Sequence, residues 1–383
     1  MRQKEVMLSV GEPSGDLHAA RLLEQLNLRN ASIHCFGMGG ARMRKQGFEA
    51  VVGIEQMAVM GLFEIIRHFP TLYGVLRKMR QLLQQRRPDL LILVDYPGFN
   101  LWLAKHAKKL GIPVLYYISP KIWVWRERRI HKIAARVDQM ALIFPFELPY
   151  YRRVGVPATY VGHPLVGKVI CSEGVKEARS AIGLDPERVT IGLFPGSRRG
   201  EVVQLLPELL ESARQMSASN PALQFILSQA PELPAELFTE GAELVASGAI
   251  SMKLLKGEVY RAIRASDAIV TASGTVTLEM ALLGTPMVVI YRMAPFSYAI
   301  LSRLIKIPYV SLVNIVAGRE VVPELLQEEA SAESIIRHLS PLLVEGIERR
   351  AMVEGLSQVR TELGEGSSAE RLSDLVEEML GIR

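Results

Sequence analysis

Cysteine and the common metal-binding patterns are scarce or missing in this sequence. Only two cysteines, Cys35 and Cys171, occur among the 383 residues, and neither forms a Cys-x-x-Cys pair. His-Glu-x-x-His and Asp-x-Asp patterns do not occur either. The sequence therefore predicts no disulfide framework and no cysteine zinc site, and we expect two reduced thiols, no metal and no cofactor.

Long apolar runs are also lacking. No stretch approaches the roughly 18 to 20 apolar residues that a membrane-spanning helix requires. The apolar part of Met1–Asp16 is only as long as one strand, which is not typical of a secretory signal. We therefore expect a cytoplasmic protein, either soluble or peripheral on a membrane.

The composition is that of a folded protein with a large core. Hydrophobic residues make up 49% of the chain and charged residues 22%, which is too apolar for disorder. The chain is about twice as long as an average domain, so two domains are expected. The net charge of +5 favours a partner with phosphate, whether nucleotide, nucleic acid or anionic membrane, without choosing among them.

Short apolar runs alternate with segments of helical spacing along the chain. The runs predicted as buried parallel strands are Val6–Val10, Ile33–Phe36, Leu90–Val94, Val114–Ile118, Met140–Phe144, Thr159–Val161, Thr190–Phe194, Gln224–Ser228, Ala268–Thr271 and Met287–Tyr291. This alternation predicts an α/β fold with two Rossmann-like, doubly wound domains that face a central cleft. We place the domains at residues 1–165 and 166–354, followed by a C-terminal helix over about 355–383.

Ligands bind beyond the carboxyl ends of strands in such sheets, so the residues there are candidates for a site. Gly11–Asp16 forms a Gly-rich turn that can offer backbone N–H groups to an anion, although an ordinary tight turn fits equally well. Asp95 follows the strand Leu90–Val94, where a carboxylate can act as a general base. The alternative for Asp95 is a helix cap or an ion pair with arginine.

Aromatic and basic residues follow further strands of the first half. Ser119–Arg126 contains two tryptophans and two cations, which suit a phosphorylated, partly apolar ligand. Phe144–Glu147 comes next, and then His163. A histidine here can contact phosphate or act as an acid, but a structural role is the more common one.

Two strand ends in the second half predict a nucleotide site. Phe194–Glu201 places Ser197 and Arg198 at a helix N-terminus, where small residues and arginine form a good cradle for a diphosphate. Ala272–Glu279 offers hydroxyl donors, and Glu279 can accept hydrogen bonds from both ribose hydroxyls. The alternative for Glu279 is an acid that merely stabilises its helix N-terminus.

Residues Met57–Arg87 combine an apolar face with a basic flank, which is typical of a segment that lies in a membrane interface. A core helix with a solvated basic face has the same pattern. Pro70 interrupts the stretch, so two helices or a helix and a loop are expected. The residues predicted to contact the membrane are Met60, Phe63, Ile66, Arg67, Phe69, Leu72, Arg77 and Lys78.

Ordered motifs over nearly the whole chain resemble the lipid-A-disaccharide synthase family. They are Gly11–Asp16, Ala58–Gly61, Val94–Asn100, Ser119–Arg126, Phe144–Glu147, Val161–Pro164, Pro195–Arg198, Ala272–Thr275, Tyr291–Met293, Tyr309–Leu312 with Asn314, and Ala317–Glu320. Each motif is weak alone, and the ordered set is strong. Pro13 and Lys121 depart from the family pattern, which bears on local loop shape.

This resemblance implies a metal-free, inverting GT-B glycosyltransferase of lipid A biosynthesis. It implies that the first domain faces acceptor and membrane and that the second binds the UDP-sugar. It also implies that the C-terminal helix, about 355–383, packs back on the first domain. The implied reaction joins UDP-2,3-diacylglucosamine to 2,3-diacylglucosamine 1-phosphate (lipid X) through a β-1,6 bond and releases UDP. The implied location is the cytoplasmic face of the inner membrane, with a homodimer left open and no nucleic-acid partner.

The family's functional residues map onto this sequence as follows. Asp95 is the expected general base, with Glu12 as the second catalytic residue. The residues expected to bind substrate are Ser14, Asn100, Ser197, Arg198, Glu201, Ser273, Gly274, Thr275, Glu279, Asn314 and Arg319. Asn314 alone could merely bind backbone.

Three other functions compete with this one. The nearest is another GT-B transferase of the UDP-GlcNAc type with a lipid-linked acceptor, such as the peptidoglycan-precursor GlcNAc transferase. A UDP-sugar epimerase of the same fold needs no membrane face. A basic nucleic-acid- or membrane-binding protein would leave Asp95, Arg198 and Glu279 without a role.

Overall fold

A computed structural model describes residues 3–29, 32–57, 69–124, 128–294 and 307–382 of the chain. The chain divides into two compact units. The first comprises Met1–Pro164 and Glu365–Arg383, and the second comprises Leu165–Gly364. The described part of the chain contains no helix with the length and apolar character needed to cross a membrane.

The first unit is built on a seven-stranded parallel sheet with the order β3-β2-β1-β4-β5-β6-β7. Its strands are β1 Lys4–Val10, β2 Ile33–Gly39, β3 Glu49–Gly53, β4 Leu90–Val94, β5 Val114–Tyr117, β6 Gln139–Leu142 and β7 Ala158–Tyr160. All five residues of the central strand β4 are buried, as expected for a strand with helices on both faces. The order reverses between β1 and β4, which makes this strand pair the switch point where such sheets bind ligands.

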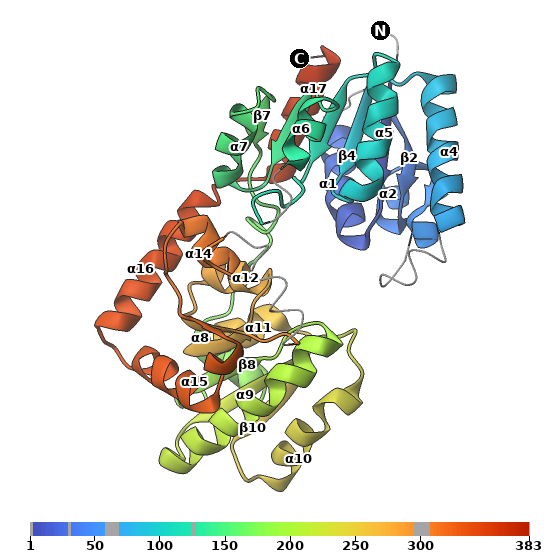
Figure 1. Cartoon of the computed structure of the whole chain (residues 1–383). Coiled ribbons are helices and arrows are strands. Elements are labelled where there is room, and N and C mark those ends of the chain that lie inside the picture. Colours follow the sequence, from blue (N-terminus) through green and yellow to red (C-terminus); the bar gives the residue numbers. More distant parts are fainter. Residues whose placement is uncertain (1–2, 30–31, 58–68, 125–127, 295–306, 383) are drawn as a thin grey trace. The chain divides into compact units, whose positions relative to one another are not determined.

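Helices connect these strands and cover the sheet (Figure 1). They are α1 Pro13–Leu28, α2 Ala41–Lys45, α4 Phe69–Arg86, α5 Pro97–Lys109, α6 Arg129–Ala134 and α7 Leu148–Arg152, with the short 3-10 turns η1 Ile54–Met57 and η2 Pro145–Glu147. Most of these helices follow a strand directly, so their N-termini lie near the carboxyl edge of the sheet.

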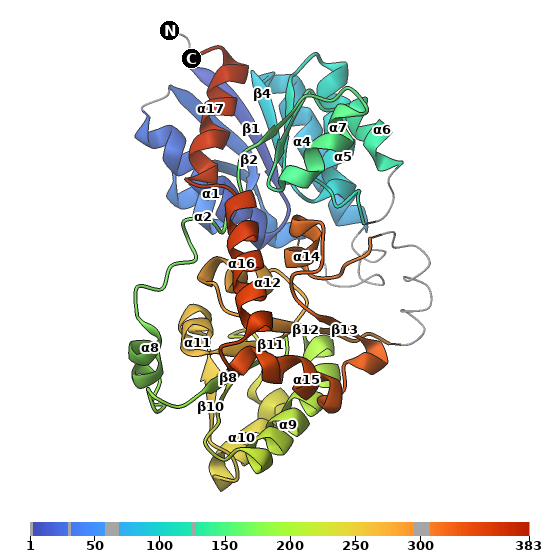
Figure 2. The ribbon, with the colours of Figure 1, turned by 90° about the vertical axis from the view of Figure 1, so that its left-hand side faces the viewer.

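The last helix, α17 Ser368–Leu380, belongs to the first unit and lies beside α1 (Figures 1 and 2). Its fully buried side chains Leu372 and Val376 join the core formed by α1, β1 and β4. Arg29, just past the end of α1, donates hydrogen bonds to the carboxylates of Asp374 at 2.7 Å and Glu377 at 3.0 Å. The segment most distant from the N-terminus in sequence therefore completes the N-terminal core.

The second unit repeats the design with a six-stranded parallel sheet of order β10-β9-β8-β11-β12-β13. Its strands are β8 Thr190–Phe194, β9 Gln224–Gln229, β10 Met252–Lys256, β11 Ala268–Ala272, β12 Met287–Tyr291 and β13 Glu324–Leu326. Its helices are α8 Val175–Ala181, α9 Arg199–Ser219, α10 Thr239–Ser247, α11 Val259–Ala265, α12 Val276–Leu283, α14 Leu312–Ala317, α15 Ala332–Leu339 and α16 Ile347–Glu362, with the 3-10 turns η3 Ala235–Phe238, η4 Gln327–Glu329 and η5 Ser340–Leu343. The predicted helix over about 355–383 thus corresponds to the end of α16, a connecting segment and α17 Ser368–Leu380.

The predicted fold class is confirmed, because both units are doubly wound parallel α/β structures. The sequence prediction missed β3, β10 and β13, and each of these is an edge strand of its sheet. An edge strand has one neighbour and is partly exposed, so it does not need a continuous apolar run. The ten predicted strands lie mostly inside the sheets, where the apolar signal is strongest.

We expect Leu372→Ala to lower the free energy of unfolding of the first unit by about 2–5 kcal/mol, because the side chain is fully buried against α1. All three tryptophans, Trp102, Trp123 and Trp125, belong to this unit, so tryptophan fluorescence during urea denaturation reports on it. Leu28→Ala is the matched control, because Leu28 is 69% exposed and its removal creates no cavity. Equal midpoints for the two variants would show that α17 does not stabilise this core.

Candidate functional site

The backbone turns sharply where β4 ends in the first unit. Asp95 and Tyr96 both adopt left-handed conformations, with φ angles of 46° and 47°. The carbonyl oxygen of Asp95 accepts hydrogen bonds from the Asn100 amide at 2.8 Å and from the Tyr116 hydroxyl at 2.6 Å. These two bonds stabilise a left-handed backbone conformation, which costs energy for residues other than glycine.

Asn100 is fully buried, and its side chain serves this turn. The amide nitrogen also lies within hydrogen-bonding distance of the carbonyls of Val94 and Ser9, and the amide oxygen accepts from the Ser9 hydroxyl at 2.7 Å. The structure therefore shows Asn100 as an internal support of the β4 turn. Its expected contact with substrate stays a prediction.

The Gly11–Asp16 turn packs against the same corner. A Cβ atom on Gly11 would lie 2.5 Å from the Tyr96 ring, so only glycine fits. The buried carboxylate of Asp16 accepts N–H bonds from Gly40 at 2.8 Å and Arg42 at 3.1 Å, which caps the start of α2. Glu12 occupies the N-cap position of α1 without a capping hydrogen bond from its side chain, and it is exposed, as is Ser14 in the first turn of that helix.

The Asp95 carboxyl group has a raised pKa. Burial is the main cause, and the charge of Glu12 raises the pKa further. The Tyr96 backbone N–H and the Lys121 ammonium oppose this shift. A carboxylate at a switch point with its pKa moved toward neutrality is well suited to accept a proton.

His163, which the sequence placed between a phosphate contact and a structural role, is buried in the first unit. Burial lowers its pKa to about 4, and its ring packs against that of Phe144 with 5.0 Å between centroids. A neutral, buried histidine favours the structural alternative.

In the second unit, the loop between β8 and α9 is held by hydrogen bonds to Glu201 in the first turn of α9. One carboxylate oxygen of Glu201 accepts the backbone N–H groups of Ser197 and Arg198, both at 3.1 Å. The other accepts from the Arg198 guanidinium at 2.8 Å. Glu201 therefore holds the loop from inside, while the Arg198 side chain remains 81% exposed and can turn to a ligand.

The loop after β11 lies next to the loop after β8. A Cβ atom on Gly196 would lie 3.3 Å from that of Ala272, which shows that the two strand ends meet. The Ser273 hydroxyl donates to the Val310 carbonyl at 2.9 Å, whereas Thr275 is exposed at the start of α12. Gly274 is half-buried between them.

Glu279 lies in the first turn of α12, and burial raises the pKa of its carboxyl group. The Tyr260 hydroxyl on α11 donates to it at 3.1 Å. Sequence reasoning missed Tyr260, because nothing in the chain marks a residue 19 positions away as its partner.

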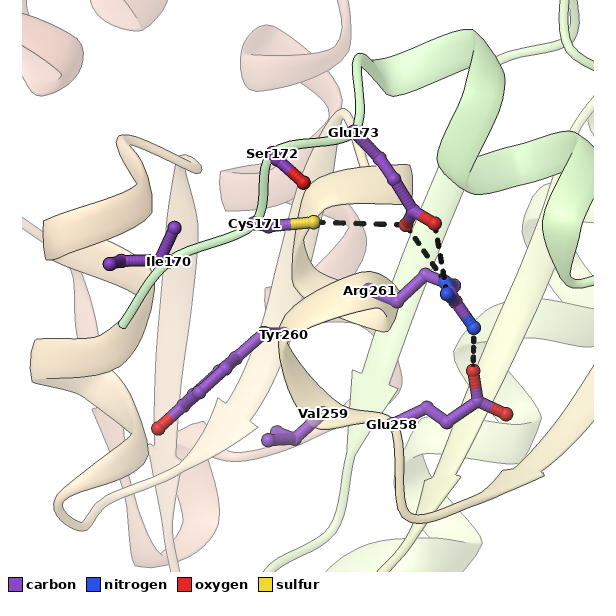
Figure 3. Close-up of a pocket in the computed structure, with 8 residues that line it drawn as sticks. All are labelled: Ile170, Cys171, Ser172, Glu173, Glu258, Val259, Tyr260 and Arg261. Atoms are coloured by element: carbon purple, nitrogen blue, oxygen red, sulfur yellow. Dashed lines mark hydrogen bonds and ion pairs between the residues drawn. The ribbon is translucent and has the colours of Figure 1, made fainter. Parts of the chain in front are cut away.

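Tyr260 also lines a hollow beside α11 (Figure 3). Arg261 fixes the wall of this hollow, because its guanidinium donates to both carboxylate oxygens of Glu173 at 2.8 Å and also pairs with Glu258. The free thiol of Cys171 lies 3.9 Å from the Glu173 carboxylate. Tyr260 thus both lines this pocket and binds Glu279.

Asn314 has no free hydrogen-bonding group for a substrate. Its amide nitrogen donates to the Val322 carbonyl and the Glu324 carboxylate, and its oxygen accepts the N–H groups of Val321 and Val322. The side chain is fully buried. The alternative of a backbone-binding asparagine therefore describes it better than the expected substrate contact.

Arg319 lies at the surface of the second unit against α16. Its guanidinium donates to the Gln358 side chain at 2.6 Å. The expected substrate contact of Arg319 stays a prediction.

Of the residues predicted to contact a membrane, Leu72, Arg77 and Lys78 lie on α4. Leu72 is half-buried, while Arg77 and Lys78 are exposed. Phe69 begins this helix. Met60, Phe63, Ile66 and Arg67 lie outside the described residues.

Over the described ranges, no three histidine, cysteine or carboxylate side chains come together as a metal site. Each unit thus has its own set of candidate residues at the carboxyl edge of its sheet. The first unit contributes Asp95 and Glu12, and the second contributes Ser197, Arg198, Ser273, Gly274, Thr275 and Glu279.

Solved structures similar to this chain share its fold. A UDP-N-acetylglucosamine 2-epimerase described as putative, from Listeria monocytogenes, aligns with a TM-score of 0.67 at 13% identity, over 100% of this chain and 98% of that one. MurG from Acinetobacter baumannii aligns with a TM-score of 0.58 at 12% identity, over 98% and 100%. At such identities these likenesses show the GT-B fold alone.

Sequence comparison gives a closer relationship. The chain is 46% identical over 379 residues to a lipid-A-disaccharide synthase from Geobacter metallireducens, covering 99% of this chain and 98% of the relative. It is 40% identical over 375 residues to the synthase of the same name from Myxococcus xanthus, covering 98% and 97%. The family model described as lipid-A-disaccharide synthetase matches residues 6–378. The chain therefore belongs to the lipid-A-disaccharide synthase family of glycosyltransferases.

Proposed function

We propose that this enzyme joins UDP-2,3-diacylglucosamine to 2,3-diacylglucosamine 1-phosphate and inverts the anomeric centre of the donor. The observation that supports this proposal best is the Asp95 carboxyl group, held by a strained turn at the switch point of the first sheet. Its raised pKa suits a group that accepts a proton during the reaction.

In the proposed reaction, Asp95 accepts the proton of the acceptor 6-hydroxyl while the hydroxyl oxygen attacks the anomeric carbon of the donor. The bond from that carbon to the diphosphate oxygen breaks, and UDP leaves with the electron pair. A single displacement of this kind converts the α-linked donor into a β-1,6-linked disaccharide. Glu12, whose charge acts on Asp95, is proposed to orient the sugar beside the base.

Charge on the departing UDP is the largest electrostatic demand of this step. We assign its stabilisation to the second unit, where the exposed Arg198 guanidinium can leave Glu201 for a diphosphate. Arginine can clamp two phosphate oxygens at once. Ser197, Gly274 and Thr275 supply further donors at the two adjoining strand ends.

Glu279 is proposed to accept hydrogen bonds from the ribose hydroxyls. The Tyr260 hydroxyl already donates to one of its oxygens, which fixes the carboxylate at the start of α12. The other oxygen is proposed to face the sugar. Tyr260 would then act by orienting Glu279.

The acyl chains of both substrates require contact with a membrane, and we propose that α4 provides part of it. Arg77 and Lys78 are exposed on this helix, and Tyr73 beside them is 55% exposed. A basic, partly apolar helix favours the anionic surface of a bilayer, with each cation contributing about 1 kcal/mol. This arrangement fits a peripheral enzyme on the cytoplasmic face of the inner membrane.

Another UDP-GlcNAc-type transferase with a lipid-linked acceptor would use the same base and the same diphosphate cradle. The family to which the chain belongs favours the lipid A disaccharide. The two reactions are separated by assaying each donor, UDP-2,3-diacylglucosamine and UDP-GlcNAc, with each acceptor, 2,3-diacylglucosamine 1-phosphate and a lipid-linked acceptor.

Asp95→Asn is expected to lower kcat by about a hundredfold to ten-thousandfold, because it removes the proton acceptor. Asparagine tolerates the left-handed backbone that Asp95 adopts, so the turn should persist. Calorimetry should give an unchanged affinity for UDP. A variant that loses turnover and UDP affinity equally would contradict the role as base.

Arg198→Ala is expected to weaken UDP binding by about tenfold or more, because a charge-assisted bidentate contact to phosphate is lost. Arg199→Ala is the matched control, since Arg199 is an exposed arginine at the next position. Calorimetric titration with UDP measures both. If the two variants bind UDP alike, Arg198 does not belong to the diphosphate site.

A further inference from the structure

A half-buried carboxylate on the edge strand β13 binds the backbone of a separate segment and has no part in the mechanism above. Glu324 begins β13 and lies opposite Val289 of the neighbouring strand β12 (Figure 2). One of its carboxylate oxygens accepts the Val310 N–H at 2.7 Å, and the other accepts the Ser311 N–H at 2.9 Å. The Glu324 side chain therefore reaches from the edge of the sheet to the two residues that precede α14.

The Asn314 side chain holds the Glu324 carboxylate from another direction. Its amide nitrogen donates at 2.8 Å to the same oxygen that accepts the Ser311 N–H. Ser311 and Asn314 are both fully buried, so these two donors are shielded from water. Three N–H groups thus converge on one carboxylate, and hydrogen bonds to a charged acceptor are stronger than those between neutral groups. The position of the carboxylate is therefore well defined.

The Ser311 N–H and the Val310 carbonyl belong to one peptide group. A trans peptide group is planar, so its N–H and its carbonyl point in opposite directions. On the side away from Glu324, the Val310 carbonyl accepts the Ser273 hydroxyl at 2.9 Å. Glu324 therefore sets the direction in which this carbonyl faces, and a rotation of the peptide group would break the hydrogen bonds on both sides.

Ser273 is the first residue of the loop that leads from β11 into α12, and we refer to residues 273–275 as the β11 loop. The Ser273 N–H donates to the Ile290 carbonyl of β12 at 3.2 Å, while its hydroxyl donates to Val310. A serine hydroxyl has one hydrogen, so it does not donate to Val310 and to a phosphate at the same time. The donors that remain for an anion are the exposed Thr275 hydroxyl and the backbone N–H groups at the start of α12. Ser273 fixes where these donors lie.

We propose that Glu324 is a positioning residue: it orients the peptide group between Val310 and Ser311, and this group holds Ser273 and the rest of the β11 loop. The consequence for UDP binding rests on the proposed function of that loop. The positioning itself does not, because it concerns only hydrogen bonds within the second unit. A purely structural Glu324, which only joined β13 to α14, would affect stability without affecting the β11 loop.

A double-variant cycle in the full-length protein tests this connection by calorimetric titration with UDP. Glu324→Gln keeps the size of the side chain but replaces an acceptor oxygen by a donor, and Ser273→Ala removes the hydroxyl at the other end. Each is expected to weaken UDP binding by about threefold to tenfold, because a hydrogen bond that orders the β11 loop is lost. The double variant should bind UDP no more weakly than the weaker single variant, because both changes break the same chain of contacts.

Glu328→Gln is the matched control, because Glu328 is an exposed glutamate four positions further along the chain. It should bind UDP as the unmodified protein does. A loss in the double variant that equals the product of the two single losses would overturn the proposal. If Ser273→Ala weakens UDP binding, a Glu324→Gln variant with a lower melting temperature and an unchanged UDP affinity would also overturn it, since that result describes a purely structural role.

Hydrogen exchange in the ligand-free protein tests the positioning independently of UDP. Peptides that cover the β11 loop, followed by mass spectrometry, should exchange faster in Glu324→Gln than in Glu328→Gln. Unchanged exchange of this loop in Glu324→Gln would overturn the proposal. Faster exchange, together with an unchanged UDP affinity in both Glu324→Gln and Ser273→Ala, would support the positioning and refute the assignment of the β11 loop to the UDP site.

Glu324→Asp is the second variant if Glu324→Gln is poorly folded. Aspartate retains the charge but is one methylene shorter, so its carboxylate is withdrawn from the Val310 and Ser311 N–H groups. Weaker UDP binding and faster exchange of the β11 loop are again expected. An aspartate variant that matches the unmodified protein in both measurements would contradict the proposed role of Glu324.

Discussion

The strained turn at Asp95 and Tyr96 is the constraint on which the rest of the first unit depends. Two consecutive left-handed residues cost roughly 1–3 kcal/mol each, and such a turn persists only where its surroundings hold it. The Asn100 amide and the Tyr116 hydroxyl do so from two elements, α5 and β5. Gly11 leaves room for the Tyr96 ring, so the turn after β1 and the turn after β4 form one corner.

In the second unit, the corresponding feature is the cationic loop between β8 and α9, which is held by contacts within the unit. Glu201 accepts both backbone donors and the guanidinium of the β8–α9 loop, which keeps Arg198 in place without burying it. The Glu201 carboxylate therefore accepts the hydrogen bonds that an anionic ligand could otherwise accept. A diphosphate that binds here must compete with Glu201, and arginine exchanges partners readily because its side chain is exposed.

Much of this could be predicted from the sequence, and the limits have physical reasons. Interior strands such as Leu90–Val94 have apolar residues on both faces, whereas the missed strands β3, β10 and β13 are edges with no such requirement. The type of a residue also does not show which groups its side chain hydrogen-bonds in the folded protein. Asn100 and Asn314 have the character of ligand-binding residues, yet both make their hydrogen bonds to backbone and side-chain groups inside the protein. Support from Tyr260 and Glu324 comes from distant positions in the sequence, so only the folded chain reveals it.

The most direct test of the account follows the reaction itself. The purified protein is incubated in detergent with UDP-2,3-diacylglucosamine and 2,3-diacylglucosamine 1-phosphate, in the presence of EDTA, and UDP release and the disaccharide are measured. The account predicts UDP release that requires the acceptor, with a tetra-acylated product whose new linkage is β-1,6 by NMR. A folded protein that binds UDP but forms no such product would contradict the proposed transfer and point to another sugar donor or lipid acceptor.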